Sequence, residues 1–432
     1  MNRVHLILVA VVLAIAGIFA FAAGSLKLRS AATACDPTRD VFLIRQHRKP
    51  GASVRAVTFF KVRPKGDEGE IELGTLEGYY AEPYRHDRKG RLFLFASDGS
   101  RHSLYEYSIC AGTLQKAIDL PEADRVITSA RYVGESNTLL VITRDGMPPA
   151  DNAINSRLEV YEKGKRISIA DVSKESPLYA FVSIAGVTSD GSIAYLREAG
   201  GDAGESWGAH YRWDKATNSV QKLGDFVITE RLGDFVITGE KEDSGYLLDA
   251  LNPSATLALR VQRATYAPDD LDKRFGPRPC LTKRAFDSGK YNSIGHELVV
   301  RDMSTQAERV VHRNLVGARN LCRNHLRTIA APRWYNDHTI VFSMPYGIYE
   351  IDIRGGNAGV IAFQNGPAQA EGFGMDVIGA NDEYLLTRRS SIVHIKTGRE
   401  VSVPALHRDP ESTNFDVTTQ FVIPVWTPGQ AD

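Results

Sequence analysis

The feature that most constrains this chain is a hairpin pattern that recurs along almost its entire length. Each copy is a short run in which apolar and polar residues alternate, followed by a turn and usually by a second short run. Alternation with a period of two places the apolar side chains on one face of a β-strand. The runs that precede the turns are Val57–Val62, Leu104–Ile109, Leu158–Tyr161, His210–Trp213, Leu298–Arg301, Ile348–Ile353 and Ile392–Ile395.

The spacing of the hairpins indicates a repeat architecture. Consecutive turns are 42 to 54 residues apart, except for one interval of 87, and a β-propeller blade takes about 40–50 residues. One four-stranded sheet cannot bury both of its faces alone, whereas radial repetition packs each sheet between two neighbours. We therefore expect an all-β chain that folds as a single β-propeller of about seven four-stranded blades. The long interval leaves six and eight blades as alternatives.

A second repeated element supports the same architecture. It is a polar turn that leads into a strongly apolar run, as expected for an inner strand that is covered on both faces. Six copies are found: Asp87–Gly90 before Leu92–Phe95, Gly134–Asn137 before Leu139–Ile142, Ser189–Gly191 before Ile193–Leu196, Asn252–Ser254 before Leu257–Leu259, Tyr335–Asp337 before Thr339–Phe342, and Gly379–Asp382 before Tyr384–Leu386.

Two of these segments resemble a known repeat family. Ala331–Phe342, followed by Gly347–Asp352, is similar to the WD40-like (PD40) repeat of TolB-type β-propellers, which reads Trp-Ser-Pro-Asp-Gly, an apolar strand, then Ile-Tyr and an Asp. Val187–Tyr195 is a second, partial match. In the other copies the Asp-Gly pair is often absent, and Trp334 is the only tryptophan at its repeat position. The resemblance implies the fold and carries no catalytic residue to this chain.

The N-terminus predicts export. Arg3 gives a positive start, and no charged residue occurs from Leu6 to Leu26, a length close to the ~20 residues that cross a bilayer as a helix. Residues 1–30 are therefore expected to form an uncleaved anchor in the inner membrane, or a signal peptide that is removed. In either case the body, residues 31–432, lies outside the cytoplasm: in the periplasm or outside, or secreted if the signal is cleaved.

The cysteine count agrees with an oxidising compartment. The chain has four cysteines, and an even count in an exported protein predicts two disulfides. Of three possible connectivities we favour Cys35–Cys110 and Cys280–Cys322, because these pairs close the shorter loops. The alternatives are a lipidated Cys35, which Lys27 and Arg29 separate from the apolar run, and a metal site using Cys280, Cys322 and His325, which lacks a matching second half.

The charge balance argues against nucleic acid as a partner. Lys and Arg together number 52, as do Asp and Glu, so the formal net charge is zero. Phosphate binding requires a basic surface. A partner is therefore expected among envelope proteins or peptides, with the membrane contacted through the N-terminal segment.

The long interval holds two unusual segments. Leu223–Thr229 recurs unchanged as Leu232–Thr238, which predicts a hairpin between the copies. A polar, Pro-containing stretch then spans about residues 263–297 and predicts a long insertion. Long loops on compact domains often carry function, so Tyr266–Glu297 is the expected partner contact.

Candidate catalytic chemistry is sparse. Gly204–Gly208 fits G-x-S-x-G, in which Ser206 would be the nucleophile of an α/β-hydrolase. The runs on both sides of Ser206 alternate like strands, so a hairpin loop is the simpler interpretation. Asp269, Asp270 and Asp272 lack the glycine and glutamate of a calcium loop, and no phosphate-binding loop or metal-binding histidine spacing is present. We expect no cofactor and no metal.

These patterns predict a non-enzymatic envelope propeller that serves as a protein- or peptide-binding platform. The alternative is an exported hydrolase or lyase with an active site in the central channel. In such a site each blade would contribute one residue, so that it would leave no local motif in the sequence.

Overall fold

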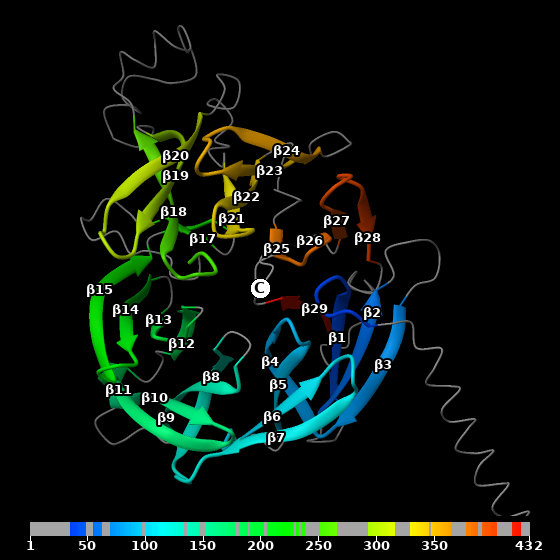
Figure 1. Ribbon diagram of the computed structural model, residues 1–432, viewed down its shortest axis with the longest axis vertical. Helices are drawn as coiled ribbons and strands as arrows, with labels where there is room; N and C mark the ends of the chain where they lie inside the picture. The colour runs from blue at the N-terminus through cyan, green and yellow to red at the C-terminus, as the bar shows by residue number, and fades with distance from the viewer. Residues whose placement is uncertain are drawn as a thin grey trace, which may run out of the picture.

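The strands of the protein form a ring of sheets around a central axis (Figure 1). Within the residues described, all regular elements are β-strands, and these form seven blades. The computed structural model describes residues 35–48, 55–62, 70–96, 101–133, 136–146, 153–177, 181–188, 190–202, 205–228, 230–232, 235–237, 251–265, 293–315, 329–344, 347–363, 377–387, 391–403 and 417–424.

Each blade is an antiparallel sheet, and from the second blade on its strands follow chain order from the axis outward. Blade two contains β4 (Tyr79–His86), β5 (Arg91–Ala96), β6 (Ser103–Ser108) and β7 (Thr113–Asp119). Blade three contains β8 (Arg125–Tyr132), β9 (Thr138–Asp145), β10 (Ala153–Glu162) and β11 (Lys165–Pro177). Blade four contains β12 (Phe181–Val187), β13 (Ile193–Asp202), β14 (Glu205–Asp214) and β15 (Ser219–Ile228).

The last three blades follow the same order. Blade five contains β18 (Leu257–Thr265), β19 (Ser293–Asp302) and β20 (Glu308–Leu315), and Leu251 forms an isolated bridge with Ala258 on the inner side of β18. Blade six contains β21 (Ala330–Trp334), β22 (Thr339–Met344), β23 (Gly347–Asp352) and β24 (Ala358–Phe363). Blade seven contains β25 (Val377–Ala380), β26 (Tyr384–Thr387), β27 (Ser391–His394) and β28 (Glu400–Ser402).

Blade one closes the ring by combining both ends of the folded chain. Its outer strands are β1 (Val41–Arg48), β2 (Arg55–Val62) and β3 (Glu70–Glu77), and its innermost strand is β29 (Val417–Pro424). β29 pairs with β1 in an antiparallel ladder and then with β4 in parallel, so blades one and two form a continuous eight-stranded sheet. The sequence patterns had assigned no strand to Val417–Pro424.

The seven hairpins expected from the alternation are confirmed as the outer two strands of the seven blades. The six polar turns precede second strands, and in five of these blades the turn directly joins the innermost strand to the second. In an antiparallel sheet these inner turns and the outer hairpin turns lie at the same end of the blade. We call this end of the ring the turn face and the opposite end the loop face.

The polar turns share one hydrogen-bonding device. A side-chain oxygen at the start of the turn accepts backbone N–H groups two to five residues later, which satisfies donors that the strand ladder leaves unpaired. The acceptors are Asp36, Asp87, Ser136, Asp190, Asn252, Asn336 and Asn381, one in each blade.

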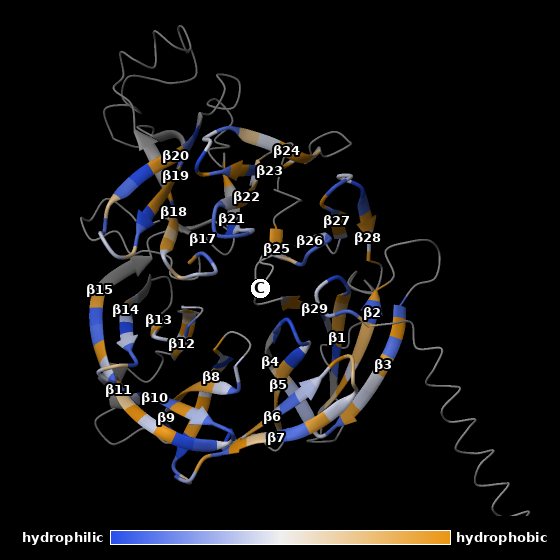
Figure 2. Ribbon diagram, viewed as in Figure 1, coloured by the Kyte–Doolittle hydropathy of each residue, from blue (hydrophilic) through white to orange (hydrophobic). Residues whose placement is uncertain are grey.

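Apolar side chains fill every junction between neighbouring blades. The described residues include seven such buried clusters, one for each junction. Figure 2 shows β1 and β2 as largely apolar, and their residues pack on blade two in one cluster and on blade seven in another. The smallest cluster lies between blades four and five, where Tyr195 and Ala255 are its fully buried members.

The prediction for the duplicated segment is wrong in its pairing. The first copy continues β15, which pairs with β14, and the second copy pairs in a small hairpin of β16 (Glu230–Leu232) and β17 (Phe235–Ile237). The copies do not pair with each other, because β14 offers the first copy a partner already fixed within a blade. β18 and β19 extend into both ends of the 263–297 segment, and the remainder lies outside the described residues.

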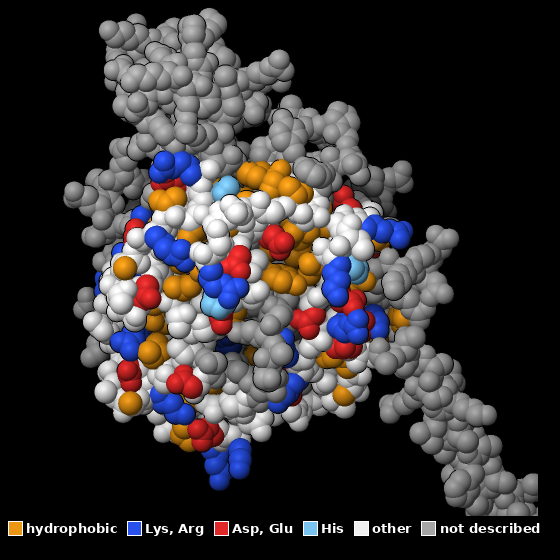
Figure 3. All heavy atoms as spheres, turned by 45° about the horizontal axis from the view of Figure 1, so that its top comes forward, with side chains coloured by type: hydrophobic (Ala, Val, Ile, Leu, Met, Phe, Trp, Pro, Cys, Tyr) orange, Lys and Arg blue, Asp and Glu red, His pale blue; other side chains and the backbone are white. Residues whose placement is uncertain are grey.

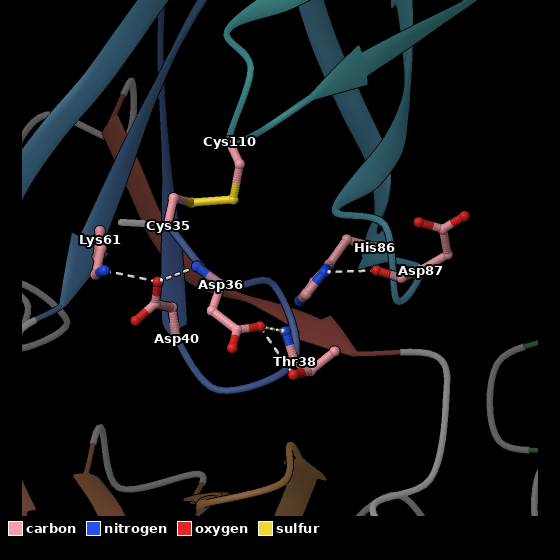
Figure 4. Close-up of a disulfide and its surroundings, with 8 residues drawn as sticks. All are labelled: Cys35, Asp36, Thr38, Asp40, Lys61, His86, Asp87 and Cys110. Carbon is pink, nitrogen blue, oxygen red and sulfur yellow. Dashed lines mark hydrogen bonds and ion pairs between the residues drawn. A yellow bond between two sulfur atoms is a disulfide. The ribbon is translucent and has the colours of Figure 1, made fainter. Parts of the chain in front are cut away.

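The predicted disulfide Cys35–Cys110 is present, with a Cα–Cα distance of 5.5 Å (Figure 4). It joins the residue that precedes the Asp36–Asp40 turn of blade one to the outer hairpin turn of blade two. The predicted Cys280–Cys322 pair and the predicted membrane segment Leu6–Leu26 lie outside the described residues. Among the residues described, no helix is long and apolar enough to span a membrane.

Blade seven is fastened to the start of the folded chain by side chains of its inner turn. Asn381 donates from its amide nitrogen to the carbonyls of Arg39 and Asp40, at 3.1 and 2.9 Å, and its side chain is buried. Asp382 donates its backbone N–H to the carbonyl of Thr38. Glu383 accepts a hydrogen bond from the Arg39 guanidinium.

We expect Asn381→Ala to destabilise the protein by about 2–3 kcal/mol, since it leaves the carbonyls of Arg39 and Asp40 without their donor and also removes the turn acceptor. Asn336→Ala is the matched control, because the bonds described for Asn336 remain within its own turn, and it should cost about 1 kcal/mol. Urea unfolding of both variants measures the difference. If the two variants unfolded at the same urea concentration, the bonds from Asn381 to the first segment would add nothing to ring closure.

Replacing Cys35 and Cys110 together by Ser should lower the free energy of unfolding by about 2–4 kcal/mol, because the bridge closes a long loop in the unfolded chain. The bridge spans 75 residues of sequence. Thermal unfolding without reductant, compared with wild type, measures the effect. A melting temperature unchanged by the double substitution would contradict a stabilising role.

Candidate functional site

Three arginines occupy the same repeat position on the innermost strands. In each of these blades the residue that begins the inner turn donates its backbone N–H to the carbonyl of the residue that ends it. The arginine lies two positions before the donor, close to the turn face. The turns are Asp87–Arg91, Val133–Thr138 and Tyr335–Thr339, and the arginines are Arg85, Arg131 and Arg333 of blades two, three and six.

Two of these arginines fasten their blade to the next one. Arg131 donates to the carbonyl of Ala185 on β12, at 3.2 Å, and Arg333 donates to the carbonyl of Val377 on β25, at 2.8 Å. Both guanidinium groups are partly buried. Hydrogen bonds of this kind fix the spacing of inner strands that have no ladder between them, so Arg131 and Arg333 have a structural role.

Arg85 has different surroundings. Its side chain is exposed. At the equivalent position the next blade carries Arg131, whereas the blades that follow those of Arg131 and Arg333 carry a small residue there. Burial, and next the charge of Arg85, lower the pKa of Arg131 to about 10, which leaves Arg131 protonated at neutral pH. Two like charges on the innermost strands of adjacent blades thus lie close together, an arrangement that favours an anion between or above them.

Glycine occupies the same repeat position in blades four and seven. A Cβ atom on Gly186 would lie 2.7 Å from Leu251, and one on Gly379 would lie 2.8 Å from Ile423. The next blade therefore fills the space that a side chain would need. These glycines give Arg131 and Arg333 close access to the backbone of the following blade, and they leave the pair Arg85–Arg131 as a distinct feature of the ring.

Each of the three arginines precedes a ring-bearing residue: His86, Tyr132 or Trp334. His86 is buried against Phe42, with ring centroids 5.4 Å apart, and burial lowers its pKa to about 3. Its Nδ1 lies 3.1 Å from the carbonyl oxygen of Asp87, which can only accept, so Nδ1 carries the proton (Figure 4). The buried ring anchors the backbone from which Arg85 extends.

The surface around the ring carries no single charged patch. Figure 3 shows Lys and Arg side chains interspersed with Asp and Glu over the visible face. On the turn face Arg88 lies 3.9 Å from Asp382, and Arg91 pairs with Asp87 at 2.6 Å. Anion recognition would therefore depend on the local pair Arg85–Arg131 and not on a long-range basic field.

The G-x-S-x-G motif around Ser206 lies partly within a strand. Ser206 lies inside β14, paired with Gly201 and Ile228, and the strand continues to Asp214. The sharp strand-to-helix turn of an α/β-hydrolase is therefore not formed there. The other weak candidates, Asp269, Asp270 and Asp272, lie outside the described residues.

The remaining predicted ligands are not brought together in the described part of the chain. Cys280, Cys322 and His325 lie outside it, and so does nearly all of the expected partner contact Tyr266–Glu297. The described residues contain no group of three or more His, Cys, Asp or Glu positioned to hold a metal ion. His394 lies at the end of β27 with its ring against Tyr384.

The sequence patterns did not single out Arg85, Arg131 or Arg333. A signal was available: an arginine followed by an aromatic or histidine ring, placed just before a polar turn, in three of the repeats. Because each blade contributes one such residue, the arginines are far apart in sequence and meet only in the closed ring.

No known protein family and no curated protein matches the chain. Among solved structures it is similar to TolB from Acinetobacter baumannii, at 10% identity and a TM-score of 0.34, over 74% of this chain and 62% of that one. The propeller domain of the Trilobed protease from Pyrococcus furiosus, which has an open velcro topology, is 11% identical over 87% and 99%, with a TM-score of 0.38. An oligogalacturonate lyase solved with manganese is 10% identical over 83% and 89%, with a TM-score of 0.38.

This chain therefore spans less than two thirds of the TolB chain. At such identities the similarity concerns the fold and assigns no activity.

The buried histidines predict how stability depends on pH. Burial lowers the pKa of His86 and of His210 to about 3, with Arg197 adding to the effect at His210. The unfolded chain binds more protons below pH 6.5, so stability should fall as pH drops from 6.5 toward 3, by at most about 1.4 kcal/mol per pH unit for each group. Urea unfolding between pH 7.5 and 4.5 measures this slope.

The variant His86→Gln is the control for this prediction and should reduce the slope, because it removes one of the buried rings. Carboxylates whose pKa is lowered in the folded protein, such as Asp302 with a pKa of about 2, reduce the stability of the protein only below their pKa in the unfolded chain, near 3.8. The window above pH 4.5 therefore excludes these carboxylates. Within it burial also lowers the pKa of His312 and raises the pKa of Glu70 and Glu308, so the contribution of His86 is measured as the difference between wild type and variant. Equal slopes for the two proteins would contradict the buried neutral state of His86.

Proposed function

We propose that this protein is a non-enzymatic β-propeller of the cell envelope that binds an acidic segment of a protein or peptide at the turn-face end of its central channel. Arg85 is the principal contact for the anion, and Arg131 supports it from the next blade. The location in the envelope rests on the apolar run Leu6–Leu26 and on the disulfide Cys35–Cys110, which suits an oxidising compartment.

The observation that carries the proposal is the difference between Arg85 and its repeat equivalents. Arg131 and Arg333 are engaged with a carbonyl of the following blade, whereas Arg85 occupies the same position with an exposed side chain beside a second guanidinium. A guanidinium group presents its donors in a planar fork that matches a carboxylate in two parallel hydrogen bonds. Aspartate and glutamate side chains of a partner have this chemistry.

The ring supplies the rigidity that such a site needs. The backbone on both sides of Arg85 is held by the buried ring of His86, by the pairing of Ile423 on β29 with Arg85, and by the Asp87 turn. Because these supports exist before a partner arrives, little ordering is required on binding. The position thus combines an exposed cation with a fixed backbone.

A fluorescent peptide rich in glutamate tests the site directly. Arg85→Gln should weaken its binding by about tenfold or more, since a charge-assisted contact contributes about 1.5–3 kcal/mol. Arg333→Gln is the matched control, because it removes a cation at the equivalent position that is engaged in the ring. It should lower stability and leave peptide binding unchanged, as measured by fluorescence anisotropy at two salt concentrations.

Capture from solubilised membranes, with residues 31–432 as bait, extends the test to natural partners. Arg85→Gln should remove the partner, and replacing Ala267–Gly295 by a Gly-Ser linker in a Cys322→Ser background tests the long insertion separately. Loss of capture only with the shortened insertion would move the site to the loop face. Turnover of an acidic polysaccharide or peptide that depends on Arg85 would favour the hydrolase or lyase alternative.

A further inference from the structure

The chain enters the propeller at the turn face and at a fixed point. Cys35, the first described residue, is held by its disulfide to Cys110 in the outer hairpin turn of blade two (Figure 4). The turn that follows is fastened from two other directions. The side chain of Lys61 lies 2.6 Å from Asp40, and a Cβ built on Gly90 of blade two would lie 3.0 Å from Pro37.

Little chain separates this point from the apolar run. Residues 27–34, eight in number, lie between Leu26 and Cys35. Fully extended, they reach about 26–29 Å at ~3.3–3.6 Å per residue. Lys27 and Arg29 belong to this segment, and their charged ends favour the lipid headgroup level, which shortens the usable reach.

The height of a blade takes up nearly the whole reach of this tether. β1 and β2 each contain eight residues, or about 26 Å at ~3.3 Å per residue, before the turns at either end are added. If the loop face lay on the membrane, the tether would have to run the full height of a blade to reach Cys35. If the turn face lies toward the membrane, Cys35 is already at the near end.

We propose that the propeller is held with its turn face toward the bilayer, and that the acidic segment which Arg85 recognises is therefore a juxtamembrane segment of another envelope protein. This inference rests on the proposed anchor and on the proposed acidic ligand. The loop face, with the ends of the long insertion at Thr265 and Ser293, is directed away from the membrane.

A protein segment fits this face better than an anionic lipid surface. The inner turns of the turn face carry a carboxylate in several blades, namely Asp36, Asp87, Asp190, Asp337 and Asp382. Flat contact with anionic headgroups would bring these carboxylates against like charge. A single acidic strand of protein can reach the Arg85–Arg131 pair without covering the surrounding turns.

Two exposed alanines at opposite ends of β7 provide matched reporters. Ala111 lies in the outer hairpin turn next to Cys110, on the turn face, and Ala123 lies in the connection from β7 to β8, on the loop face. A dye placed at either site through a genetically encoded azide leaves all cysteines in place. The full-length protein is reconstituted in neutral vesicles that contain a lipid-linked acceptor dye.

We expect energy transfer to the lipid to be several-fold higher from position 111 than from position 123. The difference should persist at high salt and without anionic lipid, because the tether and not surface charge sets the orientation. Equal transfer, or greater transfer from position 123, overturns the inference. A dependence on anionic lipid would assign the orientation to headgroup binding instead, which also overturns it.

A lipid-linked glutamate-rich peptide in the same vesicles tests the partner class. With a short spacer it should bind the wild-type protein, and Arg85→Gln should abolish this binding. Binding only through a long spacer would show that the arginine pair faces away from the membrane. If the protein fails to sediment with vesicles, both the proposed anchor and this inference are wrong. The proposed site at Arg85 is still tested by binding of the soluble acidic peptide.

Discussion

The pairing of β29 with β1 is the interaction on which the whole ring depends. Each blade buries both faces only if it has two neighbours, so an open ring would expose the inner faces of blades one and seven. Closure joins residues such as Phe42 and Val422, which are separated by nearly the whole folded chain. The entropy lost in closing so long a loop grows only slowly with its length, and one ladder with further fastenings can offset it.

Those fastenings are concentrated on the turn face. The disulfide ties the start of the chain to blade two, and Asn381 ties it to blade seven. The parallel pairing of β29 with β4 continues the sheet of blade one into blade two at the axis. The first segment of the fold is thus held by both of its neighbours.

The residues of the neighbouring blade explain why one repeat position can have three different roles. In blades four and seven the following chain leaves room only for glycine, and in blades three and six an arginine spans to the backbone beyond. In blade two the same arginine meets another arginine, and its side chain stays exposed. The chemistry of the position is decided by the neighbouring blade, which is also why no single repeat reveals it.

The predictions from sequence succeeded where the determining contacts are local. Outer hairpins such as Ile348–Ile353 with its partner strand combine alternation with a glycine turn, and Gly356 has the positive φ of 75° that the turn requires. Closure by Val417–Pro424 was missed because an isolated alternating run does not reveal a partner at the other end of the chain. The duplicated segments were paired wrongly for a related reason, since identical residues took partners from β14 and from Glu230–Leu232.

The same limit applies to the candidate site. Ser206 drew attention through a local motif, and the continuous ladder of β14 removes the turn that the motif needs. Arg85 carries only a weak local signal, and its importance comes from Arg131 in the next blade and from the end of β29 beside it. A site assembled from one residue per blade becomes visible only when the register of the ring is known.

In the proposed orientation, the disulfide also determines how far the propeller lies from the proposed anchor. Without the bridge, the first fixed point of the chain would move from Cys35 to Thr38, whose carbonyl accepts from the backbone N–H of Asp382, which adds about 10 Å of reach. Thr38 lies at the same end of the blade as Cys35, so the turn face would remain nearest the proposed tether. The bridge therefore determines how closely that face is held to the proposed anchor, whereas the direction of β1 determines which face it is.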